Sequence, residues 1–142
     1  MLKALLAPEA ARAAIEALGA SDGLGIVGPC EHILPLEPFS VANLERVRTL
    51  AADMSGAIES GSQGTFIAGS MFFARTDALL PLLRLEVHDS DFEPEVGQID
   101  GTLAHAVERL FVHSAQIAGY RLGVLGGNDN AHTVRPSQSP SY

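Results

Sequence analysis

The sequence predicts an α/β fold in which a small mixed sheet is flanked by helices. Short apolar runs rich in β-branched and aromatic residues, typical of strands, alternate with stretches whose apolar residues recur at helical spacing. With 142 residues, 46% of them hydrophobic, the chain suffices for one compact core and is too short for two ordinary domains. We therefore expect a single domain over residues 1–125 and a flexible C-terminal tail over residues 126–142.

The first half of the chain predicts two helices and a buried strand. An Ala-rich stretch at residues 8–18 has helical spacing and is followed by a glycine, which favours a helix end. Residues 24–29 are an apolar run closed by Gly and Pro, as in a buried strand. Nearby prolines predict an extended loop at residues 30–39, before a helix at about residues 41–54.

The next segments predict a strand, a short helix and a loop. Residues 65–75 follow a loop signal at residues 60–64 and form the most strand-like run in the chain, so we expect one central strand. Polar residues then offer an N-cap for a short helix at residues 78–85, whose leucines could pack on the sheet. Residues 88–95 are acidic and contain proline, which favours a loop.

The strongest helix signal runs from Asp100 to about Ala118, and residues 120–125 could form the last strand. Two or three strands are too few to make a sheet with both edges covered. We therefore expect a homo-oligomer, or an upstream partner that supplies further strands.

Charge and cysteine content exclude several classes of function. Nine basic residues against 17 acidic ones give a net charge of −8, which opposes binding to nucleic acid or to an anionic membrane surface. Arginines clustered in a cleft could still receive an anion, so a sugar nucleotide is compatible with this charge. The single cysteine, Cys30, cannot form an intrachain disulfide.

The N-terminal segment resembles an amphipathic helix more than a signal peptide, because charged residues interrupt its apolar start. No apolar run approaches the roughly 20 residues needed to cross a bilayer. We expect a cytoplasmic protein, which could associate peripherally with the inner face of the membrane.

Three motifs occur in order between residues 22 and 125. They are Gly-Ile-Val-Gly-Pro at 25–29 with His-Ile-Leu-Pro at 32–35, Phe-Ile-Ala-Gly-Ser-Met-Phe-Phe-Ala-Arg at 66–75 with Ala-Leu behind it, and Phe-Glu-Pro-Glu-Val-Gly-Gln-Ile-Asp-Gly-Thr-Leu-Ala-His-Ala-Val-Glu-Arg-Leu-Phe at 92–111. Together they resemble the rhamnan synthesis protein F family, whose members build rhamnose-containing and other bacterial surface polysaccharides. Phe73 stands where that family often has Trp.

The resemblance implies part of a GT-A-like (Rossmann-like) three-layer glycosyltransferase domain. Many inverting transferases of this fold follow a strand with an acidic residue at a helix start, and that helix ends in Ala-Gly-Tyr-Arg. Residues 66–75, Asp100 and residues 118–121 match this order. The implied activity transfers a sugar such as rhamnose from a nucleotide-diphosphate donor to a glycan acceptor, and this chain would be its acceptor-side, C-terminal portion.

Asp100 is the candidate catalytic residue. Inverting transfer needs a carboxylate that takes the proton from the acceptor hydroxyl. The resemblance assigns this role to Asp100, with Glu95 as the runner-up. A purely structural alternative remains open, because an Asp in the first turn of a helix also caps free N–H groups.

A polar helix face and two flanking residues are candidates for substrate binding. A helical wheel places His105, Glu108 and Arg109 opposite the apolar arc, where they could contact sugar hydroxyls or a diphosphate, or simply form a solvated face. Gln98 could hydrogen-bond an acceptor sugar from the preceding loop. Arg75 could pair with a phosphate or with a neighbouring acidic residue.

No metal site is predicted within the chain. Asp89-Ser90-Asp91 has the letters of an Asp-x-Asp motif but lies in a loop after the predicted central strand, which favours a solvated acidic loop. His32 and His88 have no partners at metal-ligand spacing. A complete enzyme could use Mg or Mn, held by the donor-binding half that this chain lacks.

Two further functions remain open. The chain could be a truncated, non-catalytic module that binds glycan or completes the donor half of another chain. It could also be an unrelated small oligomeric α/β protein, in which the polar helix face would have no ligand.

Overall fold

The computed structural model describes residues 5–39, 42–54, 64–94, 96–127 and 132–137. Their main sheet has four strands in the order β4-β1-β5-β6, and a second sheet pairs two short strands, β2 and β3. The strands are β1 (Leu24–Pro29), β2 (Ile33–Pro35), β3 (Thr65–Ile67), β4 (Phe73–Ala74), β5 (Arg121–Leu125) and β6 (Val134–Pro136). The helices are α2 (Pro8–Ala20), α3 (Leu36–Phe39), α4 (Leu44–Asp53), α5 (Leu80–Leu83) and α6 (Leu103–Ile117), with short 3-10 turns between some elements.

The main sheet is mixed, as predicted. β1 and β5 run parallel at its centre, and the outer strands β4 and β6 are antiparallel to them. All six residues of β1 are buried. Such burial is expected for an apolar strand at the centre of a sheet that is covered on both faces. The outer strands have only two and three residues, so the edges that they present for pairing with another chain are short.

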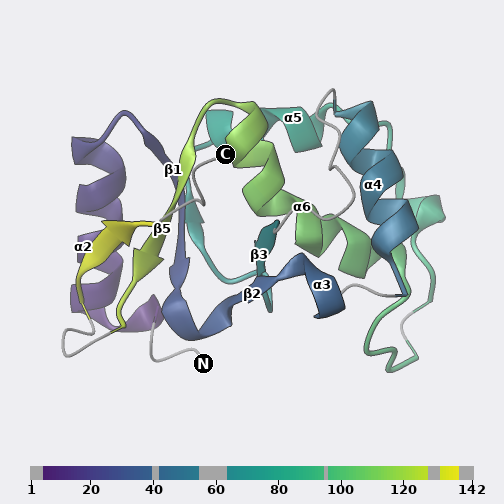
Figure 1. The fold of residues 1–142 in the computed structure, drawn as a ribbon, viewed down its shortest axis with the longest axis horizontal. Helices are drawn as coiled ribbons and strands as arrows, with labels where there is room; N and C mark the ends of the chain where they lie inside the picture. Colours follow the sequence, from purple (N-terminus) through teal and green to yellow (C-terminus); the bar gives the residue numbers. More distant parts are fainter. Residues whose placement is uncertain (1–4, 40–41, 55–63, 95, 128–131, 138–142) are drawn as a thin grey trace.

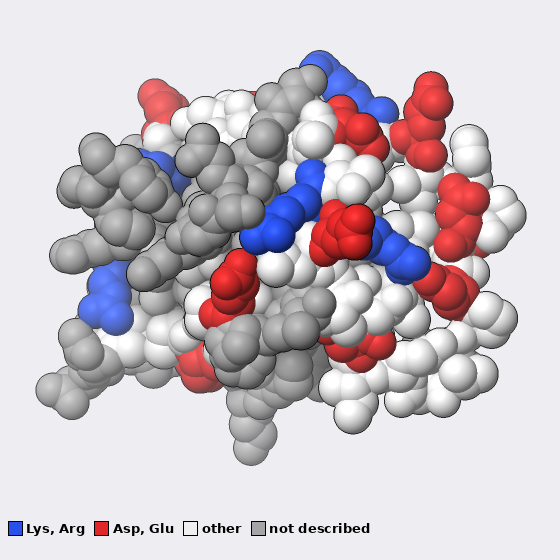
Figure 2. All heavy atoms as spheres, turned by 45° about the vertical axis from the view of Figure 1, so that its right-hand side comes forward, with Lys and Arg blue, Asp and Glu red and all other residues white. Residues whose placement is uncertain are grey.

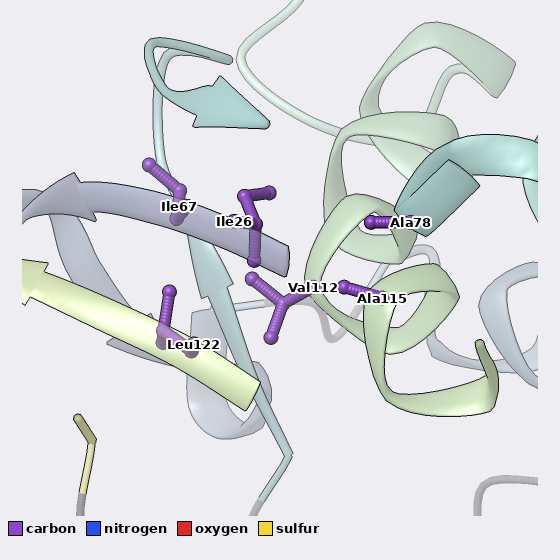
Figure 3. Packing of buried hydrophobic residues seen from close by; sticks show 6 residues of the cluster. All are labelled: Ile26, Ile67, Ala78, Val112, Ala115 and Leu122. Atoms are coloured by element: carbon purple, nitrogen blue, oxygen red, sulfur yellow. The ribbon is translucent and has the colours of Figure 1, made fainter. Parts of the chain in front are cut away.

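Helices cover both faces of the main sheet. Figure 1 shows α2 on one side of β1 and β5, with α6 on the other side and α4 beyond it. Val27 and Leu125 pack with α2, whereas the neighbouring Ile26 packs with α6. In Figure 3, Ile26 of the sheet meets Val112 of the helix in this second core. The expected sheet flanked by helices is therefore confirmed.

The prediction of a single central strand over residues 65–75 is wrong. The run breaks at Gly69 and Ser70, whose φ angles of 83° and 51° lie in the left-handed region. β3, before the break, joins β2 in the small sheet, and β4, after it, becomes an edge of the main sheet. Strand propensity is high on both sides of the break, but a left-handed turn cannot continue a strand.

Smaller differences concern segments expected to be irregular or helical. The extended loop expected at residues 30–39 contains a 3-10 turn, β2 and α3. The helix expected at residues 78–85 is reduced to a 3-10 turn and one turn of α-helix, and its Leu83 is 69% exposed. The tail expected from residue 126 contributes β6, which pairs with β5. The loop signal at residues 60–64 lies, except for Gly64, outside the described residues.

The longest helix starts three residues later than expected. α6 begins at Leu103, with Thr102 as its N-cap, and Asp100 lies in the preceding loop. It ends before Gly119, which has a φ of 86°, as the sequence predicted. Within the described part of the chain, no helix is both long and apolar enough to cross a membrane.

Candidate functional site

Three parts of the chain meet at Asp100. Asn43, the residue before α4, donates from Nδ2 to Oδ1 of Asp100 at 2.7 Å. Nη2 of Arg109, in the middle of α6, lies 3.5 Å from the same oxygen. Asn43 is 1% exposed, whereas the Asp100 side chain is 23% exposed. One carboxylate oxygen is thus held by the protein, while the group as a whole remains partly open to solvent.

Arg109 is the buried centre of this site, with 6% of its side chain exposed. Its guanidinium is paired with the carboxylates of Asp100 and Glu108. It also donates to the His105 carbonyl at 3.1 Å and lies over the ring of Phe66, 4.7 Å from its centroid. A buried charge requires such partners, because taking it out of water is costly.

The expectation that Arg109 lies on a polar arc outside the core is therefore wrong. The helical wheel places it opposite the main apolar residues, but α6 is covered on more than one side. Leu110 packs toward α4 and Val112 toward the main sheet. The arc between them faces Phe66 of β3, so Arg109 is enclosed as well.

Glu108 connects α6 to the turn between β3 and β4. Its side chain is 16% exposed, and its Oε1 accepts a hydrogen bond from the N–H of Gly69 at 2.5 Å. Its other oxygen is paired with Arg109. Glu108 therefore holds in place the turn that interrupts the expected central strand.

The cap of α6 is built by residues other than Asp100. Oγ1 of Thr102 accepts from the His105 N–H at 3.4 Å and lies 2.6 Å from His105 Nδ1. Oε2 of Glu93 accepts from the Leu103 N–H at 2.8 Å. Since these groups serve the first turn of the helix, the capping alternative for Asp100 is wrong.

Glu93 carries a strongly perturbed carboxylate. Its pKa is lowered from 4.5 to about 2, chiefly because the Leu103 N–H donates to it, and the ion pair with Arg46 at 2.8 Å also contributes. The partial positive charge at the N-terminus of α6 also stabilises the Glu93 carboxylate and therefore also lowers its pKa. Arg46 belongs to α4, so this pair joins the starts of two helices.

We expect Glu93→Gln to change the acid sensitivity of the protein. A carboxylate whose folded pKa is depressed contributes stability that is complete above pH 4.5 and is lost as pH falls through about 2. The stability difference between wild type and Glu93→Gln should therefore shrink over that interval, measured by urea denaturation at successive pH values. The control is Glu45→Gln, because the Glu45 carboxylate has no hydrogen bond or ion pair among the described residues. An equal pH dependence in all three proteins would contradict the assignment.

The structure uses Gln98 within its own loop. Its amide accepts from the Val96 N–H at 2.9 Å and donates to the Pro94 carbonyl at 2.8 Å. Glu95, the runner-up base, lies outside the described residues. The loop nevertheless exposes two large apolar side chains, Val96 and Ile99, at 79% and 93%.

Arg75 is not brought together with Asp100. It contacts Tyr120, which follows the C-terminal end of α6, whereas Asp100 precedes the N-terminal end. A 15-residue helix separates these ends by about 22 Å. Of the predicted substrate-binding residues that the structure describes, Glu108, Arg109 and His105 join the Asp100 site, and His105 does so through its carbonyl and through its side-chain contact with Thr102.

The sequence interpretation missed several residues of the site. They are Asn43, Arg46, Phe66, Glu93 and Thr102. The only local signal among them is Thr102, a preferred N-cap residue at the start of an apolar periodic stretch. The other four act across the fold, because they reach α6 or its preceding loop from α4, from β3 or from a loop ten residues upstream.

Charges on the α4 side of the molecule are mixed. Figure 2 shows basic and acidic side chains in contact with one another on this face. Two of the ion pairs are Arg46 with Glu93 and, at 3.4 Å, Arg48 with Glu37. Among its described residues, this face lacks the continuous basic patch on which nucleic-acid binding depends.

Asp89 and Asp91 lie in a 3-10 turn, in which Oδ2 of Asp91 accepts from the His88 N–H at 2.8 Å. That carboxylate therefore serves the turn. The described ranges contain no group of three or more His, Cys, Asp or Glu side chains arranged to hold a metal ion.

The comparison with protein families decides where the chain belongs. The model of the rhamnan synthesis protein F family matches residues 40–120, more than half of the chain. The chain belongs to this family. The matched stretch includes every residue of the Asp100 site, from Asn43 to Arg109.

Two curated relatives in the same comparison are both called uncharacterized protein WxcX. They come from Xanthomonas campestris pv. campestris, strains B100 and ATCC 33913, and each is 39% identical over 122 residues. The aligned part is 86% of this chain and 17% of each relative, so the chain spans about a sixth of their length. No solved structure matches the chain significantly.

The two carboxylate oxygens of Asp100 have different hydrogen-bond surroundings, and this difference determines the chemistry that Asp100 can perform. Oδ1 is held by Asn43 and Arg109, whereas Oδ2 has no hydrogen-bond partner among the described residues. A carboxylate fixed through one oxygen can accept a proton through the other from a hydroxyl within hydrogen-bond reach. The arrangement therefore suits an oriented proton acceptor.

Proposed function

We propose that this family member takes part in the synthesis of a bacterial cell-surface polysaccharide, such as a rhamnan or a lipopolysaccharide O-antigen. In this proposal the chain forms the acceptor side of a GT-A-like glycosyltransferase. The enzyme transfers a sugar such as rhamnose from a nucleotide-diphosphate donor to a glycan acceptor. Family membership supports the pathway, and the oriented carboxylate of Asp100 supports the reaction.

The observation that carries the proposed reaction is the asymmetric anchoring of Asp100. Asn43 and Arg109 hold Oδ1, which leaves Oδ2 for the acceptor hydroxyl. In the transfer step, Oδ2 takes the hydroxyl proton as the acceptor oxygen bonds to the anomeric carbon. The bond from that carbon to the donor phosphate breaks, and the nucleoside diphosphate leaves with the electron pair.

The leaving diphosphate needs positive charge, which we assign to a donor-binding part of a longer protein or of a partner chain. Mg or Mn bound there would supply it in the complete enzyme. The arginine nearest to Asp100 is unsuited to this task, because Arg109 is buried and paired with two carboxylates.

The proposal is tested by a transfer assay with dTDP-rhamnose, a rhamnose-oligosaccharide acceptor and divalent metal, carried out on a protein that contains both this chain and its donor-binding part. We expect Asp100→Asn to reduce nucleoside diphosphate release at least about 100-fold, because it removes the general base while keeping the shape of the side chain. The matched control is Asp53→Asn, at an exposed position of α4, which should retain wild-type turnover. Equal activity of wild type and Asp100→Asn would reject Asp100 as the base.

A non-catalytic module is the second candidate. The internal pairing of the Asp100, Glu108 and Arg109 charges favours it, since an ion-pair network of this kind also serves to join α4, α6 and β3. In that case wild type and Asp100→Asn would both release no nucleoside diphosphate, and the wild-type chain would still bind the acceptor oligosaccharide.

A further inference from the structure

A separate depression lies beyond the C-terminal end of α6. Its volume is about 570 Å³, within the usual range for small-molecule sites. It is lined by Leu18, Gly19, Arg75, Thr76, Asp77 and Leu80. None of these residues takes part in the contacts around Asp100. We propose that this depression is a second saccharide subsite, which binds a neutral sugar unit by its hydroxyl groups.

The two charged side chains of the depression each have a partner within the protein that orients them. Nη1 of Arg75 donates to the Leu18 carbonyl at 3.0 Å, and its guanidinium lies over the Tyr120 ring, 5.5 Å from the centroid. The Tyr120 hydroxyl donates to Oδ2 of Asp77 at 2.6 Å, which lowers the pKa of Asp77. Tyr120 thus orients both groups, and a ligand that uses them loses little additional side-chain freedom.

The charges of the depression suit a polyol better than a phosphate. Nε of Arg75 lies 3.7 Å from Oδ1 of Asp77, so the positive charge has a negative neighbour and the pair is neutral overall. A guanidinium donates hydrogen bonds and a carboxylate accepts them, so together they match the mixed donor and acceptor character of sugar hydroxyls. A phosphate would meet the repulsion of Asp77.

The remaining lining matches the other features of a sugar. Leu80 is 41% exposed and offers an apolar surface to the C–H groups of a pyranose ring. The Thr76 hydroxyl has no hydrogen-bond partner among the described residues and can serve a further sugar hydroxyl. Gly19 has no side chain, and a Cβ built there meets nothing within 4 Å.

Gly19 allows the depression to be blocked without disturbing the core. A side chain at this position starts in open space on the wall of the depression, so the ring of Gly19→Tyr should obstruct it while α2 remains folded. The control is Ala20→Tyr, at the next residue of α2, which is exposed and does not line the depression. Asp77→Asn tests the hydrogen-bonding contribution separately, because it preserves shape and removes the charge.

The experiment measures binding of a rhamnose disaccharide by amide NMR titration; this choice of sugar rests on the proposed function. We expect wild type and Ala20→Tyr to show ligand-dependent shifts at Arg75, Thr76 and Tyr120. Gly19→Tyr should weaken binding at least about tenfold because its ring occupies the depression, and Asp77→Asn should do so because hydrogen bonds to a charged group are lost. Inorganic phosphate should leave these amides unshifted.

The outcomes separate this inference from the proposed transfer reaction. Disaccharide binding that Gly19→Tyr abolishes would support the subsite even if the chain has no transferase activity. Disaccharide shifts confined to the residues around Asp100, no binding at all, or binding that Gly19→Tyr leaves unchanged would each overturn it. Phosphate-dependent shifts at Arg75 would also overturn it, because they would identify an anion site.

Discussion

Replacing Arg109 by alanine is expected to lower the free energy of unfolding by about 3–5 kcal/mol. The Arg109 side chain is 6% exposed, and its charge compensates Asp100 and Glu108, whose side chains are 23% and 16% exposed. Its removal leaves two partly buried carboxylates without their shared cation and also exposes the face of the Phe66 ring. Urea denaturation at neutral pH would measure the loss.

The matched control is Arg46→Ala, which removes an arginine from an exposed ion pair. Arg46 and Glu93 are 41% and 36% exposed, and pairs of this kind contribute roughly 1 kcal/mol or less. Combining Arg109→Ala with Asp100→Asn should recover part of the loss in stability, because the second substitution removes the negative charge of Asp100 that the first leaves unpaired. A cost for Arg109→Ala no greater than that of Arg46→Ala would contradict the view that Arg109 organises the site.

Gly25→Ala is expected to destabilise the protein by about 3 kcal/mol, at the upper end of the range for overpacking. A Cβ at this position of β1 would lie 2.3 Å from Cβ of Tyr120 and 3.0 Å from Cβ of Ala78. Both atoms are attached directly to backbone, so neither can move aside as a flexible side-chain end would. β1 would have to separate from the neighbouring chain segments, and the shift in thermal unfolding would report this.

Gly19→Ala is the control for Gly25→Ala. Its new methyl group meets nothing within 4 Å, and alanine is favoured over glycine in a helix by about 1 kcal/mol. We therefore expect unchanged or slightly raised stability for Gly19→Ala. If Gly25→Ala were as stable as Gly19→Ala, the close packing of β1 against Tyr120 would be wrong.

The sequence predicted the elements whose patterns are local. α2, β1, α6 and β5 were expected close to their observed positions, because helical spacing or an apolar run bounded by Gly and Pro already describes each of them. The same information predicted a mixed sheet flanked by helices. Motifs in the sequence were also enough to indicate the family, which the family comparison confirmed.

Candidate site residues were harder to predict than the fold. The sequence singled out Asp100 and Arg109 but could not indicate that they contact each other or that Asn43 completes the group. A helical wheel shows which residues share a face and leaves open what covers that face. Arg109 was therefore expected outside the core, although β3 brings Phe66 against it.

The sequence by itself determined the periodic elements, the acidic charge and the family. Only the tertiary structure decided that residues 65–75 divide between two sheets, that Arg75 lies far from Asp100, and that Arg109 is enclosed by carboxylates. The physical reason is that helical and strand patterns depend on neighbours along the chain. Burial, ion pairing and the breaking of a strand by a turn depend instead on segments that only folding brings together.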